Sequence, residues 1–77
     1  MNKTRRKEIA RAIELMEQAR EILEAVRDEE QEAFDNMPES LQGSERGEAM
    51  EGYISTLEEV VGSLDVDTAP LQEIVDG

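Results

Sequence analysis

Hydrophobic residues recur every three or four positions in two long stretches of the chain. The first stretch can be described as a seven-residue repeat with positions a to g, counted from Ile9 at position a. Position a is then occupied by Ile9, Met16, Leu23, Glu30 and Met37, and position d by Ala12, Ala19, Val26 and Ala33. The stripe is widened by flanking apolar residues, namely Ile13, Leu15, Ile22 and Phe34. Such spacing places apolar side chains on one face of a helix and predicts an amphipathic helix over residues 3–36.

A turn and a second helix follow. The residue before a proline is pushed out of the helical region, so the first helix is expected to end before Pro38. The segment "PESLQGS" is predicted to form the turn, with Ser44 as the N-cap of the next helix. A second apolar stripe has Met50, Leu57, Leu64 and Leu71 at position a, and Tyr53, Val60 and Ile74 at position d. It predicts a second helix over residues 44–64, and its last members, Leu71 and Ile74, lie beyond that range.

Pro70 interrupts the second stripe near its end. Proline removes a backbone donor from a helix but is accepted in a first turn, so two outcomes are open. Either the second helix continues with a kink, or a short third helix occupies residues 68–76 with Thr68 as its N-cap. The unbroken spacing from Leu64 to Leu71 favours a kink or short break over a detached tail.

Two helices joined by a short turn form an antiparallel hairpin. The predicted fold class is therefore all-α, and residues 1–77 are expected to form a single helical-hairpin domain. Folding about residue 40 gives the expected layers, which pair Ile9 with Leu71, Met16 with Leu64, Leu23 with Leu57, Ala19 with Val60 and Val26 with Tyr53. Ion pairs at i,i+3 are expected along the first helix, at Glu8–Arg11, Glu17–Arg20 and Glu24–Arg27.

A two-helix hairpin cannot cover all of this apolar surface. Four residues flank the predicted seam and are expected to support self-association: Ile13, Leu15, Ile22 and Val61. An exposed apolar patch of this kind usually marks an interface. Two hairpins could dimerise into a four-helix bundle, or another protein could cover the patch.

The second helix contains three glycines, each of which weakens a helix by roughly 1 kcal/mol relative to alanine. Gly47, Gly52 and Gly62 are expected to point mostly outward. The favoured interpretation is that tertiary packing tolerates them. The alternative is that they allow another backbone to approach closely, or that this helix orders on binding.

The charge is strongly negative and unevenly distributed. The chain has 20 acids, 8 bases and a net charge of −12. Residues 1–27 hold seven bases and five acids, whereas residues 28–77 hold fifteen acids and only Arg46 as a base. Such a surface repels nucleic acid and anionic membrane and attracts basic protein surfaces, so no direct nucleic-acid or membrane binding is expected. The alternative is that the acidity only keeps the protein soluble.

Nine acids are predicted to gather at the turn end of the hairpin. We call this group the acidic head, and it comprises Asp28, Glu29, Glu30, Glu32, Asp35, Glu39, Glu45, Glu48 and Glu51. Glu30 occupies an a position, where the seam favours leucine. One hypothesis is a docking surface for the basic groove of a protein partner, imitating the charge density of DNA. The other is a solvated helix end.

Catalytic and metal-binding patterns are weak. The chain has no Cys, His or Trp, which removes the usual general base and the commonest metal ligands. "LDVDTA" resembles the Asp-x-Asp-x-Thr nucleophile motif of haloacid-dehalogenase-type phosphatases, but that motif requires a strand end in a large α/β domain. As a calcium loop it fails at Ala69 and Pro70. We therefore expect a non-enzymatic protein without a cofactor or metal.

No apolar run exceeds two residues, and the basic start "MNKTRRK" is not followed by an apolar stretch. A membrane span and a signal peptide are therefore not expected, and the expected location is the cytoplasm.

The turn region carries a resemblance to a known group. Pro38–Gln42 reads "PESLQ" and Ser44–Gly47 reads "SERG". The segment resembles the central part of small acidic helical proteins of Gram-positive bacteria and their phages, which are mostly uncharacterised. The chain departs from that pattern at "VGSLDVDTAP", where relatives have continuous heptads. The resemblance implies a phage or prophage setting, in which small acidic proteins often inhibit host defence enzymes, anti-CRISPR proteins among them.

Overall fold

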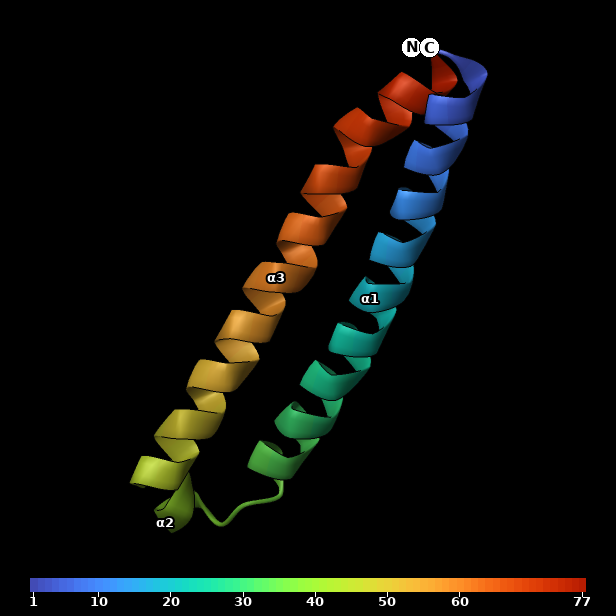
Figure 1. The fold of residues 1–77 in the computed structure, drawn as a ribbon. Helices are drawn as coiled ribbons and strands as arrows, with labels where there is room; N and C mark the ends of the chain where they lie inside the picture. Colours follow the sequence, from blue (N-terminus) through green and yellow to red (C-terminus); the bar gives the residue numbers. More distant parts are fainter.

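The computed structural model describes residues 1–77 as three helices and no strands (Figure 1). Helix α1 spans Lys3–Asp35, the short α2 spans Glu39–Gln42 and α3 spans Glu45–Asp76. The two long helices lie side by side and antiparallel, so both chain termini are at one end, called here the open end (Figure 1). The molecule is a rod with extents of 58 × 15 × 13 Å. The predicted all-α hairpin is confirmed.

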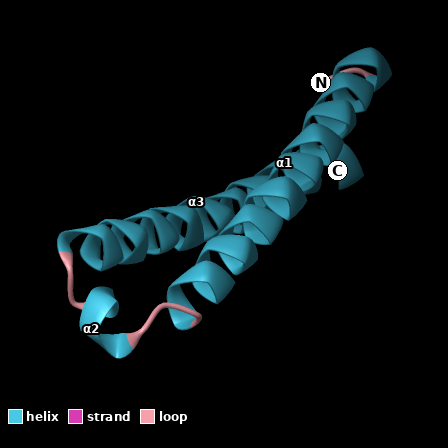
Figure 2. Cartoon of the chain, turned by 90° about the horizontal axis from the view of Figure 1, so that it is seen from below, coloured by secondary structure: helices cyan, strands magenta, loops and turns pink.

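The helix starts follow from side-chain capping. The Asn2 Oδ1 accepts a hydrogen bond from the Arg5 N–H at 2.8 Å, and the predicted N-cap Ser44 accepts one from the Gly47 N–H at 3.3 Å. Each cap satisfies a backbone donor that the first helical turn leaves free. Between the long helices, α2 forms a single turn inside the segment predicted as a loop; Figure 2 shows it set below the ends of α1 and α3.

Helix α3 continues as one helix past residue 64 and past Pro70, the continuation that the spacing from Leu64 to Leu71 favours. A separate third helix over 68–76 does not form. Thr68 does not act as a cap, because its hydroxyl donates to the Asp65 carbonyl at 3.1 Å from inside the helix. Leu71 and Val75 are half-buried, which indicates that packing against α1 holds the last two turns in place despite the missing proline donor.

The seam between α1 and α3 uses positions a and e, not the predicted a and d. At e, Ile13 and Ile54 are only 5% and 6% exposed. At d, Tyr53 is 61% exposed and Val26 is 44% exposed. The predicted layers that paired Ala19 with Val60 and Val26 with Tyr53 are therefore wrong. The residues at d lie exposed along one side of the seam, and comprise Ala12, Ala19, Val26, Ala33, Tyr53, Val60 and Ile74.

Charge explains why e enters the seam. An a/d seam would bury Asp67, and an unpaired buried carboxylate is costly. With a and e inside, Asp67 stays exposed and the smaller, polar Thr68 is half-buried in its place. The α1 residues at e include Arg20 and Arg27, whose long stems can lie along apolar surface while their charged ends reach solvent.

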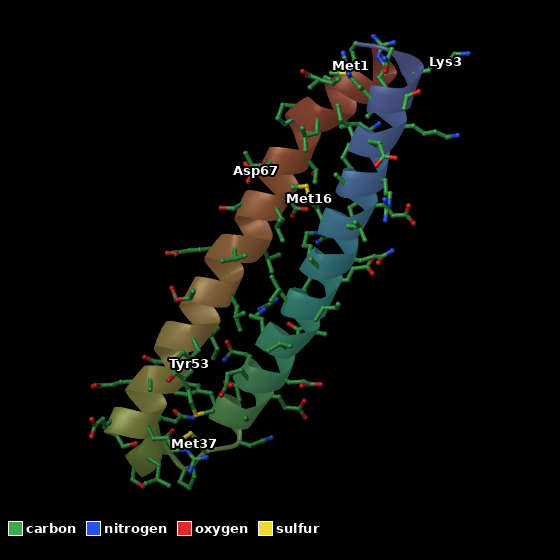
Figure 3. All side chains as sticks on the ribbon, viewed as in Figure 1. Met1, Lys3, Met16, Met37, Tyr53 and Asp67 are labelled. Atoms are coloured by element: carbon green, nitrogen blue, oxygen red, sulfur yellow. The ribbon has the colours of Figure 1, made fainter.

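The hydrophobic core is small. Only four residues are buried, Gly47 and three hydrophobic side chains, Ile13, Met50 and Ile54. Met16 contributes as a half-buried residue that projects between the long helices (Figure 3). A chain of this size buries too little surface to be more than marginally stable by itself.

Candidate functional site

The turn end is held by the packing of α2 on the start of α3. A Cβ at Gly47 would lie 2.6 Å from the Gln42 carbonyl carbon, so only glycine fits without a shift of the backbone. The Gln42 side chain donates from Nε2 to the carbonyls of Phe34 and Met37 at 3.1 and 3.2 Å. Phe34 lies in the last turn of α1 and Met37 just beyond its end, where carbonyls are not all satisfied by the helix itself.

We call the close packing of Gln42 on Gly47, together with the two Gln42 side-chain hydrogen bonds, the clamp. It was not predicted from the sequence. Gly47 was expected to point outward, yet it is buried, and the backbone that approaches it belongs to the same chain. The only signal was that Gly47 falls at position e. Gly52 and Gly62 are exposed, and a Cβ added at either would have no atom within 4 Å, as expected for outward residues.

The clamp positions the acidic head around the turn. Its carboxylates come from the last two turns of α1, from α2 and from the first two turns of α3. Glu30 is half-buried and the other eight residues are exposed. One ion pair reaches the group, from the Arg27 Nη2 to the Asp28 Oδ1 at 3.0 Å. Arg46 forms no ion pair, so eight of the nine acids have no cationic partner within 4 Å.

In the middle of the rod, two acids of α3 are paired with arginines of α1, whereas Glu14, Glu17, Glu21 and Glu59 have no cationic partner within 4 Å. The Arg20 Nε lies 3.1 Å from the Asp65 Oδ1, and the Arg27 Nη1 lies 3.5 Å from the Glu58 Oε1. Of the expected i,i+3 pairs, only Glu8–Arg11 forms, at 3.8 Å.

Arg20 pairs instead with Glu24, at 3.1 Å. Arg20 and Arg27 do not form the expected pairs with Glu17 and Glu24 because both arginines lie at the seam. From there they reach Asp65 and Glu58, which occupy b positions of α3.

The open end is basic. Lys3, Arg5, Arg6 and Lys7 form no ion pair. A shallow hollow lies there, lined by Lys3, Thr4, Arg6, Lys7, Ala10 and Val75. The Nε of Arg6 is buried without a hydrogen-bond partner. Lys3 marks this end in Figure 3, and Met37 marks the turn end.

The charges of α1 oppose its own dipole at both ends. The N-terminus of a helix carries partial positive charge and the C-terminus partial negative charge. The first turn of α1 has no acid and the last turn has no base. Lys3, Arg5 and Arg6 therefore lie at the positive end, and Glu32 and Asp35 at the negative end. This arrangement costs α1 stability, and among these charges only Asp35 has a side-chain hydrogen bond, accepted from the Gln31 Nε2 at 3.0 Å.

The four residues expected to support self-association separate into two groups. Ile13 is buried in the seam and Val61 is half-buried there, so both pack within the hairpin. Leu15 is 55% exposed and Ile22 is 64% exposed, and both lie on the outside of α1.

The geometry provides no obvious reaction centre. No group of three or more His, Cys, Asp or Glu side chains is placed to hold a metal ion. Asp65 and Asp67, which gave the phosphatase-like and calcium-like motifs, lie in the middle of α3 rather than at a strand end or in a loop. No helix combines the length and the apolar character that crossing a bilayer requires. The features that remain are the charged ends and the apolar outside of α1.

Comparison of the chain with protein-family models, with curated proteins and with solved structures finds no match. The resemblance of the turn segment to small phage-related acidic proteins therefore stays a prediction.

Proposed function

We propose that the protein is a non-enzymatic interaction module whose acidic head binds the basic groove of a nucleic-acid-handling protein and inhibits or modulates it. The observation that carries the proposal is the concentration of unpaired acids at the turn end. Eight of the nine head carboxylates have no cation within 4 Å, whereas four of the eleven acids elsewhere are paired with an arginine.

The placement of these acids supports a role outside the hairpin. Glu32 and Asp35 lie in the last turn of α1, where negative charge is unfavourable. Charges that weaken the local element in which they lie are typical of functional sites. The Gln42 and Gly47 clamp fixes the two helix ends relative to each other, so the carboxylates are presented on a rigid element.

The charge density is comparable to that of duplex DNA. The head segment of α1, residues 28–35, extends about 12 Å at 1.5 Å per residue. Together with the acids of α2 and α3 the head places nine carboxylates at this end of the rod. Duplex DNA presents a charge roughly every 1.7 Å along its axis, so a groove that takes DNA could take this end by electrostatics alone.

A phage or prophage setting and an anti-CRISPR-like activity are specific forms of this hypothesis. The direct test is capture from a lysate of a Gram-positive host on the immobilised protein, followed by competition with a short DNA duplex. A groove-binding partner should be released by the duplex and by moderate salt, because both compete for the same cationic side chains.

A pair of charge-matched variants decides whether the head is responsible. The head variant replaces Glu29, Glu30, Glu32 and Asp35 with glutamine or asparagine. The control variant replaces four unpaired acids of the stem, Glu14, Glu17, Glu21 and Glu59, in the same way. Both change the net charge equally, so the head variant should lose the captured protein and the control should retain it. Equal retention by the two variants overturns the proposal.

A second candidate function is a structural homodimer without a heterologous partner, in which the acidity serves solubility. The observation that favours it is the apolar outside of α1, where Leu15 and Ile22 are more than half exposed. Capture of no other protein at low or moderate salt, together with self-association, would support this candidate.

A further inference from the structure

The outside of α1 carries a second apolar stripe with heptad spacing. We call this the outer stripe, and it consists of Ala12, Leu15, Ala19, Ile22 and Val26. Its steps of three and four residues are those of a helix-packing seam. At 100° per residue, the stripe is centred about 110° around α1 from the seam with α3, so α3 cannot cover it. All five residues are exposed.

The outer stripe is free of charge in a strongly charged chain. Charged residues make up 36% of the sequence. On α1, the acids between residues 12 and 26 all fall on other faces of the helix, and are Glu14, Glu17, Glu21 and Glu24. The neutral residues Gln18 and Ala25 border the stripe instead. A contiguous exposed stripe without charge indicates a surface that another chain covers.

We propose that the occupant is a second copy of this chain, with the two α1 helices packed antiparallel along their outer stripes. The midpoint of the stripe is Ala19, which is also the midpoint of α1. A two-fold axis at Ala19 therefore superimposes the whole of one stripe on the other. The alanines at residues 12 and 19 allow the two helix backbones to approach closely.

Charge selects the antiparallel orientation. A parallel pair would place the two acidic heads together and the two basic open ends together. An antiparallel pair brings Lys3, Arg5, Arg6 and Lys7 of each chain alongside the acids at the end of the other α1. Within one rod these groups are separated by the length of α1, roughly 45 Å, far beyond the screening length of about 8 Å at physiological salt.

The arrangement also explains two features that the single hairpin leaves unexplained. The four cations at the open end have no partner within their own chain, and α1 bears charges opposed to its dipole at both ends. In the antiparallel pair, each unfavourable end lies beside opposite charge. Four cations meet the five head acids of α1, and four more head acids lie on α2 and α3, so part of the head remains negative. Dimerisation of this kind does not require the head to bind another protein.

Sedimentation of the full chain tests the interface. We expect a species of twice the 8.7 kDa chain mass at micromolar concentration. Leu15→Asp and Ile22→Asp should each raise the dissociation constant by at least about a hundredfold, because two-fold symmetry places each change in the interface twice. Val66→Asp is the matched control: Val66 is 71% exposed, lies on α3 outside the stripe, and its replacement should leave the dimer intact.

A cross-linking experiment tests the orientation, and the absence of cysteine in the chain allows single thiols to be introduced. Glu8→Cys and Glu29→Cys place thiols at the same heptad position, about 32 Å apart along α1. With a short bifunctional thiol reagent, an antiparallel dimer should cross-link only when the two variants are mixed.

Cross-linking of either variant alone overturns the antiparallel pair. A monomer at all concentrations, or loss of the dimer in Val66→Asp but not in Ile22→Asp, overturns the interface. Helix content measured by circular dichroism identifies any variant that fails to fold, and Leu15→Asn and Ile22→Asn then serve as milder replacements with the same expected direction.

Discussion

The backbone of Gln42 lies directly against Gly47, so close that a Cβ at Gly47 would meet the Gln42 carbonyl carbon at 2.6 Å. The contact joins α2 to the first turn of α3 and, through the Gln42 side chain, to the last turn of α1. The geometry of the acidic head therefore depends on two uncharged residues.

The three glycines of α3 should respond to alanine in opposite directions. Gly47→Ala should lower the free energy of unfolding by about 1–3 kcal/mol, since the added methyl forces a backbone shift. Gly52→Ala and Gly62→Ala should each raise it by up to about 1 kcal/mol, because alanine favours the helix and both positions are open. Urea unfolding at one protein concentration measures all three. Stabilisation by Gly47→Ala would contradict the close packing of α2.

Gln42 should stabilise the turn through its two side-chain hydrogen bonds. Gln42→Ala leaves the Phe34 and Met37 carbonyls without that donor, and should cost about 1–2 kcal/mol. Gln72 is the matched control, because its Nε2 donates at 3.0 Å to the exposed Asp76 Oδ1. Gln72→Ala should change the stability by less than about 0.5 kcal/mol. Equal effects of the two changes in urea unfolding would show that the clamp contributes nothing.

The choice of seam is tested by two neighbouring residues. Ile54→Ala should lower the free energy of unfolding by about 2–4 kcal/mol, because Ile54 is 6% exposed and lies in the seam. Tyr53→Ala should cost less than about 0.5 kcal/mol, since Tyr53 is exposed at a d position. Thermal unfolding followed by circular dichroism ranks the two. A larger effect at Tyr53 would restore the a/d seam.

The hairpin could be predicted from the sequence because the two long apolar stripes and the "NMPES" break are the same whether position d or position e is buried beside position a. Which of the two positions is buried could not be predicted from hydrophobicity. Position d carries Val26, Tyr53 and Val60, and position e carries Ile13 and Ile54 as well as Arg20 and Arg27, so large apolar residues mark both flanks of position a. The a/e seam buries Ile13 and Ile54, pairs Arg20 with Asp65 and Arg27 with Glu58, and leaves Asp67 exposed.

The location of the acidic head at the turn could also be predicted from the sequence, because the sequence indicates both the helix ends and the positions of the acids. The contacts that hold the turn in place could not be predicted. The short helix α2 and the Gln42 bonds join residues five to eight apart through backbone carbonyls, and no side-chain pattern reports such contacts. The continuity of α3 past Pro70 depends on packing of Leu71 and Val75 against α1, which local propensity alone does not include.

Neutralising the acids at the end of α1 should strengthen the fold while it weakens the head. Glu32→Gln and Asp35→Asn remove negative charge from the C-terminal turn, where the helix dipole disfavours it. Each should raise the free energy of unfolding of the monomer by about 0.3–1 kcal/mol, measured at low ionic strength and at a concentration below dimerisation. Asp35→Asn keeps an oxygen acceptor for the Gln31 Nε2, which donates to the Asp35 Oδ1 at 3.0 Å.

Glu45→Gln and Glu48→Gln are the matched controls, since these acids lie in the first turn of α3, where negative charge is favourable. They should lower the stability by a similar amount. Added salt should reduce the effects of both pairs, because all four carboxylates are exposed. If the free energy of unfolding rises for Glu32→Gln and Asp35→Asn and falls for Glu45→Gln and Glu48→Gln, the last turn of α1 retains its acids at the expense of stability. A binding surface requires such a cost. Destabilisation by both pairs would instead assign the head acids a structural role.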